Sequence, residues 1–190
     1  MQIRSLDHGH SATTRQLRRL DSSDDSAGKS LGSNASKQQE INAGIDATLA
    51  RTYAEVPGSR GLMARAQGIL VFPKVLQGGR TLGGEYGVGA LRVGGSTRDY
   101  YNLVLVLPDI QAGVESTAVV FLFMTEHALN TFESRQGWLV SGDTSVEMLK
   151  MGANGTIGTL AKPVGVIVLT NAGLMVNLSP QGMKISPVSI

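Results

Sequence analysis

The sequence has no cysteine, no long apolar segment and only a small excess of charge, and each absence excludes a class of protein. Without cysteine there can be no disulfide, no thiolate metal site, no cysteine nucleophile and no lipid-carrying cysteine. No apolar run approaches the roughly 18 residues of a transmembrane helix, and the first 30 residues lack the apolar segment of a secretory signal. A net charge of +2 is too small to predict a nucleic-acid partner on its own.

Motifs for catalysis and for cofactors are missing as well. Beyond the first 35 residues the only histidine is His127, and it is not part of a recognisable metal-binding or catalytic motif. The glycines of residues 83–89 are followed by a strand pattern and not by a helix or a phosphate-binding lysine. We therefore predict no enzymatic activity, no cofactor, no structural metal and no bound nucleotide. An unrecognised carboxylate site stays open as an alternative, with these candidates: Asp99, Asp109, Glu115 and Asp143.

The stretch from Leu62 to Val93 organises the rest of the chain. Its residues 68–72 read GILVF, which is apolar enough to predict a strand covered on both faces. Pro73 and Lys74 are predicted to break this strand and to open a loop. Several glycines then follow in a strand-like segment, where missing side chains let a helix, a strand or a ligand approach the backbone. We favour packing over a ligand, because a phosphate-loop signature is absent.

The chain is predicted to have a tail and one domain. Residues 1–35 are rich in Ser, Asp, Gly and Arg and hold few large aliphatic side chains, which predicts a disordered tail. Residues 36–190 are predicted to form the domain. Ser36 and Gln39 have capping-box spacing, so the first helix is expected to begin there and to end near Val56, before Pro57. A second short helix is expected over residues 59–66.

Turn signals separate the remaining apolar runs, which predicts antiparallel strands. Gly94-Gly95 and Asn154-Gly155 are two-residue hairpin signals, and residues 171–173 and 179–182 are two further turns. One helix interrupts the strands, with Thr125 as its cap. The predicted fold class is therefore α+β, with N-terminal helices packed on an antiparallel β-barrel or sandwich and one inserted helix.

Charge is distributed in blocks. Residues 51–98 carry seven basic and two acidic side chains, whereas residues 99–150 carry two basic and seven acidic ones. In one interpretation the two blocks pair with one another across the fold, and each exposed ion pair contributes under about 1 kcal/mol. In the other, the basic block faces an anionic surface. Both interpretations remain open from the residues alone.

The series AxGILVFPKV, GGR, GGEYGVGALRV and the pair Tyr100-Tyr101 resembles the SYLF domain, a lipid-binding family, in its bacterial form. The later segments VVFLFMTEHALNTF and VLTNAGLMVNLSPQGMKIS fit the same family, so the resemblance covers residues 38–190. It implies binding to phosphoinositides or other anionic phospholipids, with actin binding in some eukaryotic members. It also implies a lipoprotein-like place in the cell envelope or periplasm, peripheral to the membrane. Residues 102–118 depart from the family pattern, as does the absence of a lipid-carrying cysteine.

The residues predict where such a lipid would bind. Lys74 and Arg80 flank a loop whose Val75 and Leu76 are expected to be exposed, so two cations and two aliphatic side chains would meet a phospholipid headgroup. Arg60 and Arg65 are expected to add to this site if they lie on the same side. The predicted function is non-catalytic binding of anionic phospholipid at a membrane surface, without nucleic acid or nucleotide and with no protein partner identified. The main alternative is a structural or interaction protein of the bacterial cell envelope without a lipid headgroup site.

Overall fold

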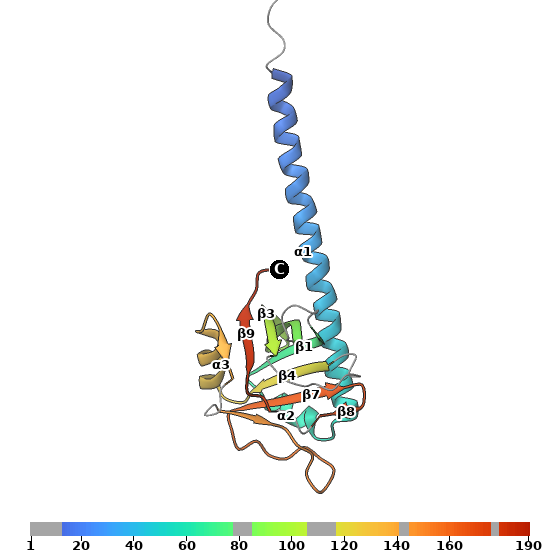
Figure 1. The fold of residues 1–190 in the computed structure, drawn as a ribbon, viewed down its shortest axis with the longest axis vertical. Coiled ribbons are helices and arrows are strands. Elements are labelled where there is room, and N and C mark those ends of the chain that lie inside the picture. Colours follow the sequence, from blue (N-terminus) through green and yellow to red (C-terminus); the bar gives the residue numbers. More distant parts are fainter. Residues whose placement is uncertain (1–12, 78–84, 106–116, 141–144, 176–178) are drawn as a thin grey trace, which may run out of the picture. The chain divides into compact units, whose positions relative to one another are not determined.

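The computed structural model describes residues 13–77, 85–105, 117–140, 145–175 and 179–190 of the chain. The chain divides into two compact units, residues 1–38 and residues 39–190. The described elements, in chain order, are α1 (Thr13–Glu55), α2 (Ser59–Arg65), β1 (Gly68–Gln77), β2 (Glu85–Val93), β3 (Ser96–Leu105), β4 (Thr117–Phe123), α3 (Glu126–Glu133), β5 (Trp138–Leu139), β6 (Val146–Met148), β7 (Val164–Thr170), β8 (Gly173–Leu174) and β9 (Met183–Pro187) (Figure 1).

Helix α1 begins at Thr13, well before the predicted start at Ser36. Ser36 lies inside the helix, where its hydroxyl donates a hydrogen bond to the Gly32 carbonyl at 2.9 Å, so the predicted capping box is wrong. Extending an existing helix adds about one hydrogen bond per ordered residue, whereas starting one is costly, so a packed C-terminal part favours extension toward the N-terminus. The helix ends at Glu55, two residues before Pro57, as predicted. Residues 1–12 lie outside the described part.

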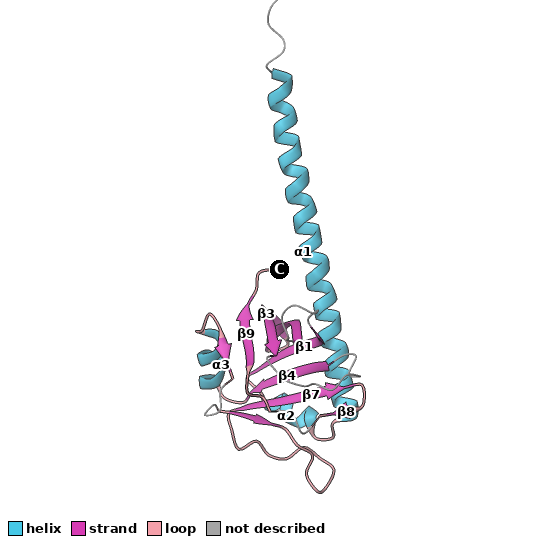
Figure 2. Ribbon diagram, in the orientation of Figure 1, coloured by secondary structure: helices cyan, strands magenta, loops and turns pink. Residues whose placement is uncertain are grey.

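Nine strands form one mixed sheet in the described part of the chain. The strand order is β5-β9-β3-β2-β1-β4-β7-β6, and β8 pairs with β7. All pairings are antiparallel except the one between β6 and β7. Figure 2 shows the inserted helix α3 beside this sheet. The predicted α+β class, with N-terminal helices on a sheet and one inserted helix, is confirmed, although the sheet is not purely antiparallel.

The central strands are buried on both faces, as predicted for residues 68–72. Every residue of β4 and of β7 is buried. Alternate side chains of these strands enter two different hydrophobic clusters, because successive residues of a strand point to opposite faces. One cluster contains α3 together with β3, β5 and β9, so the sheet curls around it. The other contains Ile45 of α1 with Leu62 and Met63 of α2.

Strand β1 continues through Pro73 and Lys74, which corrects the predicted break. Its pairing with both neighbouring strands shifts register next to these residues, up to Val75. Proline has no N–H to donate, so it fits a strand where the ladder of hydrogen bonds is interrupted. The predicted loop is thereby shortened, and residues 78–84 lie outside the described part.

The predicted turns and the predicted helix cap are found. Gly94 and Gly95 join β2 to β3 with φ of 59° and 83°, the backbone that a two-residue hairpin turn requires. The Thr125 side chain accepts a hydrogen bond from the Ala128 N–H at 3.1 Å and so caps α3. After Asn154-Gly155 the chain forms a single bridge, between Met151 and Ile157, instead of the expected pair of strands.

Candidate functional site

Three of the predicted lipid-binding residues do not match the expectation or lie outside the described part of the chain. Lys74 is exposed on β1, as expected, but the side chain of Val75 is only 2% exposed because it packs in the core. The expectation that Val75 offers an apolar contact at the surface is therefore wrong. Arg80 and the side chain of Leu76 lie outside the described residues.

The other two predicted cations lie on α2. Arg60 and Arg65 are both exposed, and the Arg60 guanidinium carbon lies 4.4 Å from the centroid of the Tyr53 ring. Helix α2 leads into β1 at Gly68, and Lys74 lies six residues further along that strand, or about 20 Å at 3.3 Å per residue. Arg60 and Arg65 thus lie on α2, whereas Lys74 lies on β1.

Three further cations of the basic block are engaged in ion pairs. Arg51 pairs with Glu55 on α1 at 2.8 Å, and Arg92 of β2 pairs with Asp46 of α1 at 2.7 Å. The third pair joins the two charge blocks, since Arg98 of β3 contacts the carboxylate of Glu133 of α3 at 3.0 Å. Ion pairs within the fold thus engage part of the basic block. The sequence alone did not decide between such pairing and a free basic surface.

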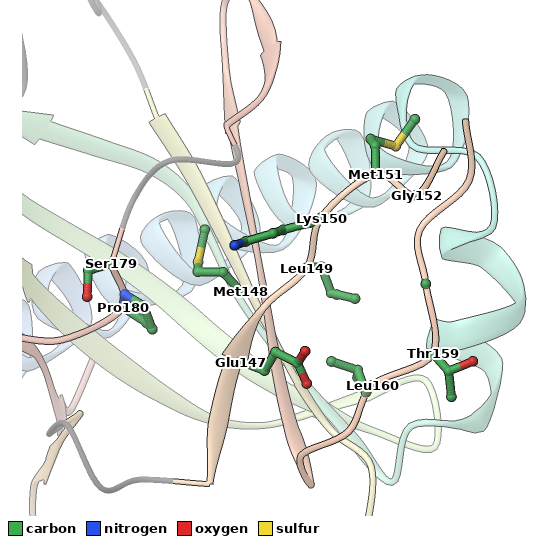
Figure 3. Close-up of a pocket in the computed structure, with 11 residues that line it drawn as sticks. Glu147, Met148, Leu149, Lys150, Met151, Gly152, Thr159, Leu160, Ser179 and Pro180 are labelled. Carbon is green, nitrogen blue, oxygen red and sulfur yellow. The ribbon is translucent and has the colours of Figure 1, made fainter. Parts of the chain in front are cut away.

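A cavity of about 640 Å³ lies against the edge strand β6, and sequence reasoning did not find it. Figure 3 shows its lining side chains, which come from β6 and the segment after it, the segment before β7 and the segment before β9. The lining residues are Glu147, Met148, Leu149, Lys150, Met151, Gly152, Gly158, Thr159, Leu160, Ser179 and Pro180. Its volume lies in the range of small-molecule sites, roughly 300–1,000 Å³.

The cavity combines an apolar wall with one cation and one carboxylate. Met148 and Leu149 are buried in the wall, whereas the side chain of Met151 is 40% exposed at the rim. Lys150 is exposed and forms no ion pair with another described residue. Lys150 is not among the residues that the sequence analysis assigned to a lipid site. No local signal in the sequence indicates this cavity, because Ser179 and Pro180 lie far from Lys150 along the chain and meet it only in the fold.

A second cavity, of about 400 Å³, lies between α3 and the sheet. Phe132 and Trp138 line its apolar side, and His127 and Arg135 also border it. Within the described ranges, no three His, Asp or Glu side chains are grouped so that they could hold a metal ion. Among the helices described, none combines the length and the apolar character needed to cross a bilayer.

Comparison with known proteins identifies a family for the C-terminal part of the chain. Residues 109–189, which include β4 to β9, match the family model described as Ysc84, Las17-binding protein actin regulator. A search of curated proteins found no match. The matched range includes VVFLFMTEHALNTF and VLTNAGLMVNLSPQGMKIS, two of the segments on which the resemblance rests. The SYLF domain family predicted from the sequence is thus confirmed over residues 109–189, which match its Ysc84 model.

Proposed function

We propose that this protein binds anionic phospholipid headgroups, phosphoinositide-like ones among them, at a membrane surface and without catalysis. The protein would act as a peripheral membrane protein of the bacterial cell envelope, as the family resemblance implies. The matched family is described by Las17 binding and actin regulation, and we do not transfer that activity to this chain.

One observation carries the proposal. Arg60, Arg65 and Lys74 are exposed and form no ion pair with another described residue, whereas other cations of the same block are paired. Each Lys or Arg held near an anionic leaflet contributes about 1 kcal/mol, and the attraction fades beyond about 10 Å at 0.1 M salt. Because these exposed cations belong to two different elements, α2 and β1, a membrane surface is a better partner than one small ligand.

Sedimentation with vesicles tests the proposal. The protein should sediment with vesicles that contain phosphatidylglycerol or a phosphoinositide and should stay in solution with pure phosphatidylcholine. High salt should release it, because screening weakens each of the exposed contacts.

Charge reversal identifies which cations meet the membrane. Lys74→Glu with Arg80→Glu reverses the pair predicted from the sequence, and Arg60→Glu with Arg65→Glu reverses the pair on α2. We expect the first pair to reduce binding to anionic vesicles about tenfold or more, with the melting curve little changed. Lys184→Glu, which reverses an exposed lysine of β9, is the control. Lys150 is not used as a control, because it lines the cavity beside β6.

Binding that ignores both headgroup charge and salt would contradict the proposal. The alternative, a structural or interaction protein of the cell envelope without a headgroup site, would then be the better description. If only the Arg60 and Arg65 reversal weakens binding, the function stands and the predicted site at Lys74 is wrong.

A further inference from the structure

The carboxylate of Glu147 is held in place by backbone donors on one of its two oxygens. Its Oε2 atom accepts hydrogen bonds from the backbone N–H groups of Ala161 and Lys162, at 2.9 and 3.2 Å. These bonds fix the side chain at the cavity wall, next to Leu160 (Figure 3). The second oxygen, Oε1, accepts no hydrogen bond from another described residue, although a carboxylate can accept several.

Lys150 supplies the opposite charge to the same cavity without neutralising this carboxylate. In Figure 3 the Lys150 ammonium points toward Met148 and the Ser179 side, whereas the Glu147 carboxylate points toward Leu160. The two groups form no ion pair with each other. A ligand that bears both an anion and a cation would offer each of these two groups a partner of opposite charge.

The remaining wall favours an amphiphile as the source of such a ligand. Leu149, Leu160 and Pro180 give the cavity apolar surface, and Met151 carries that surface to the rim. Methionine side chains adapt to irregular apolar partners such as the glycerol and upper acyl region of a lipid. A freely soluble zwitterion would leave this apolar wall in contact with water.

We propose that the cavity beside β6 selects aminophospholipids whose headgroup carries both a phosphate and a primary ammonium, of the phosphatidylserine type. The phosphate accepts hydrogen bonds from the Lys150 ammonium, and the headgroup ammonium donates to Oε1 of Glu147. This inference rests on the proposed function, since it narrows the headgroups that the membrane-bound protein prefers. Phosphatidylcholine does not satisfy the site, because its quaternary ammonium has no N–H to donate.

Two vesicle types of equal net charge separate headgroup selection from general attraction. Phosphatidylserine and phosphatidylglycerol each carry one net negative charge, and only the former has an ammonium. With equal mole fractions of either lipid in phosphatidylcholine, the full-length protein should bind the phosphatidylserine vesicles about fivefold more tightly, the effect of one additional charge-assisted hydrogen bond.

Glu147→Gln is the decisive variant. The glutamine carbonyl can still accept from the N–H groups of Ala161 and Lys162, so the fold and the melting curve should be retained. The preference for phosphatidylserine should disappear, while binding to phosphatidylglycerol vesicles should stay at or slightly above that of the parent. Lys150→Gln should weaken binding to both vesicle types by about fivefold. Glu126→Gln on α3 and Lys184→Gln on β9, both exposed, are the matched controls.

A soluble headgroup distinguishes binding of the free headgroup from binding of the same headgroup on a membrane lipid. Glycerophosphoserine carries the phosphate and the ammonium but no acyl chain, and its binding is followed by the NMR shifts of residues 147–160. If it binds in a Glu147-dependent manner while the protein ignores all vesicles, the cavity inference stands and the proposed membrane function fails. Equal binding to the two vesicle types without Glu147-dependent glycerophosphoserine binding would overturn the inference. Retention of the full preference by Glu147→Gln would overturn it as well.

Discussion

A side chain at Gly89 would collide with the backbone of Val71. A Cβ built on Gly89 lies 2.0 Å from the Val71 carbonyl oxygen and 2.7 Å from the Phe72 ring. The contact arises where β1 shifts register against β2, between Val71 and Val75. Gly89 thus makes room for the backbone of β1 and not for a ligand. This agrees with the prediction that the glycines of this segment serve strand packing.

Gly89→Ala should therefore destabilise the fold strongly. The backbone of β1 must move to admit the methyl group, and overpacking of this kind costs roughly 1–3 kcal/mol or more. Thermal and urea denaturation measure the effect. Gly61→Ala on α2 is the control, because a Cβ there meets nothing within 4 Å and alanine is the better helix former. An unchanged stability for Gly89→Ala would show that β1 and β2 do not approach as described.

Asn42 joins α1 to the β2–β3 hairpin. Its Nδ2 donates to the Tyr100 hydroxyl at 3.1 Å, and its Oδ1 accepts from the Thr97 hydroxyl at 2.7 Å. Asn42→Ala should lower the free energy of unfolding by roughly 1–2 kcal/mol, since two part-buried groups lose their partner. A double-mutant cycle with Thr97→Val should give a coupling of about 0.5–1.5 kcal/mol. Additive losses would mean that the two side chains do not interact in solution.

Ionisation of the buried Tyr101 side chain should destabilise the folded protein in alkali. Burial raises the pKa of Tyr101 from 10.0 to about 12, and the Asp99 and Glu133 carboxylates add to the rise, while Arg98 opposes it. Because the folded state holds this proton more tightly, the stabilisation is complete below pH 10 and is lost as the pH rises through 12.

The difference between the parent and Tyr101→Phe isolates this effect from other alkaline titrations. Between about pH 9 and about pH 11 the free energy of unfolding should fall by roughly 1–3 kcal/mol more for the parent than for the variant. Urea denaturation at the two pH values measures this difference. Tyr86→Phe, which removes the hydroxyl of an exposed tyrosine, controls for the chemical change itself. Parallel pH profiles for the parent and Tyr101→Phe would contradict the prediction.

Deletion of residues 1–35 should leave the melting temperature unchanged within about a degree or two. The compact unit that contains the sheet begins at Gln39, and the side chain of Leu31 is 70% exposed. A helical segment outside the compact unit of a folded core adds little to the stability of that core. Circular dichroism should show the loss of helical signal that follows from the extension of α1 to Thr13. A drop of several degrees would place the domain boundary earlier than residue 36.

The sequence by itself determined the features that depend on neighbours along the chain. Pro57 ends α1, Thr125 caps α3 and Gly94-Gly95 turns the chain between β2 and β3, because each acts on its own backbone. The uninterrupted apolar run of residues 68–72 also indicated a strand covered on both faces, since burial on both sides removes the polar alternation.

Only the tertiary structure decided the features that depend on distant segments. The burial of Val75 follows from the register shift of β1 against both of its neighbours, and no local pattern encodes that shift. The cavity exists because β6 runs parallel to β7 and the turn at Ser179-Pro180 lies beside them. Its two charged groups, Glu147 and Lys150, look like ordinary surface residues in the sequence. Glu147 and Lys150 are only three residues apart, but the fold alone brings Leu160, Ser179 and Pro180 from other segments to line the same cavity.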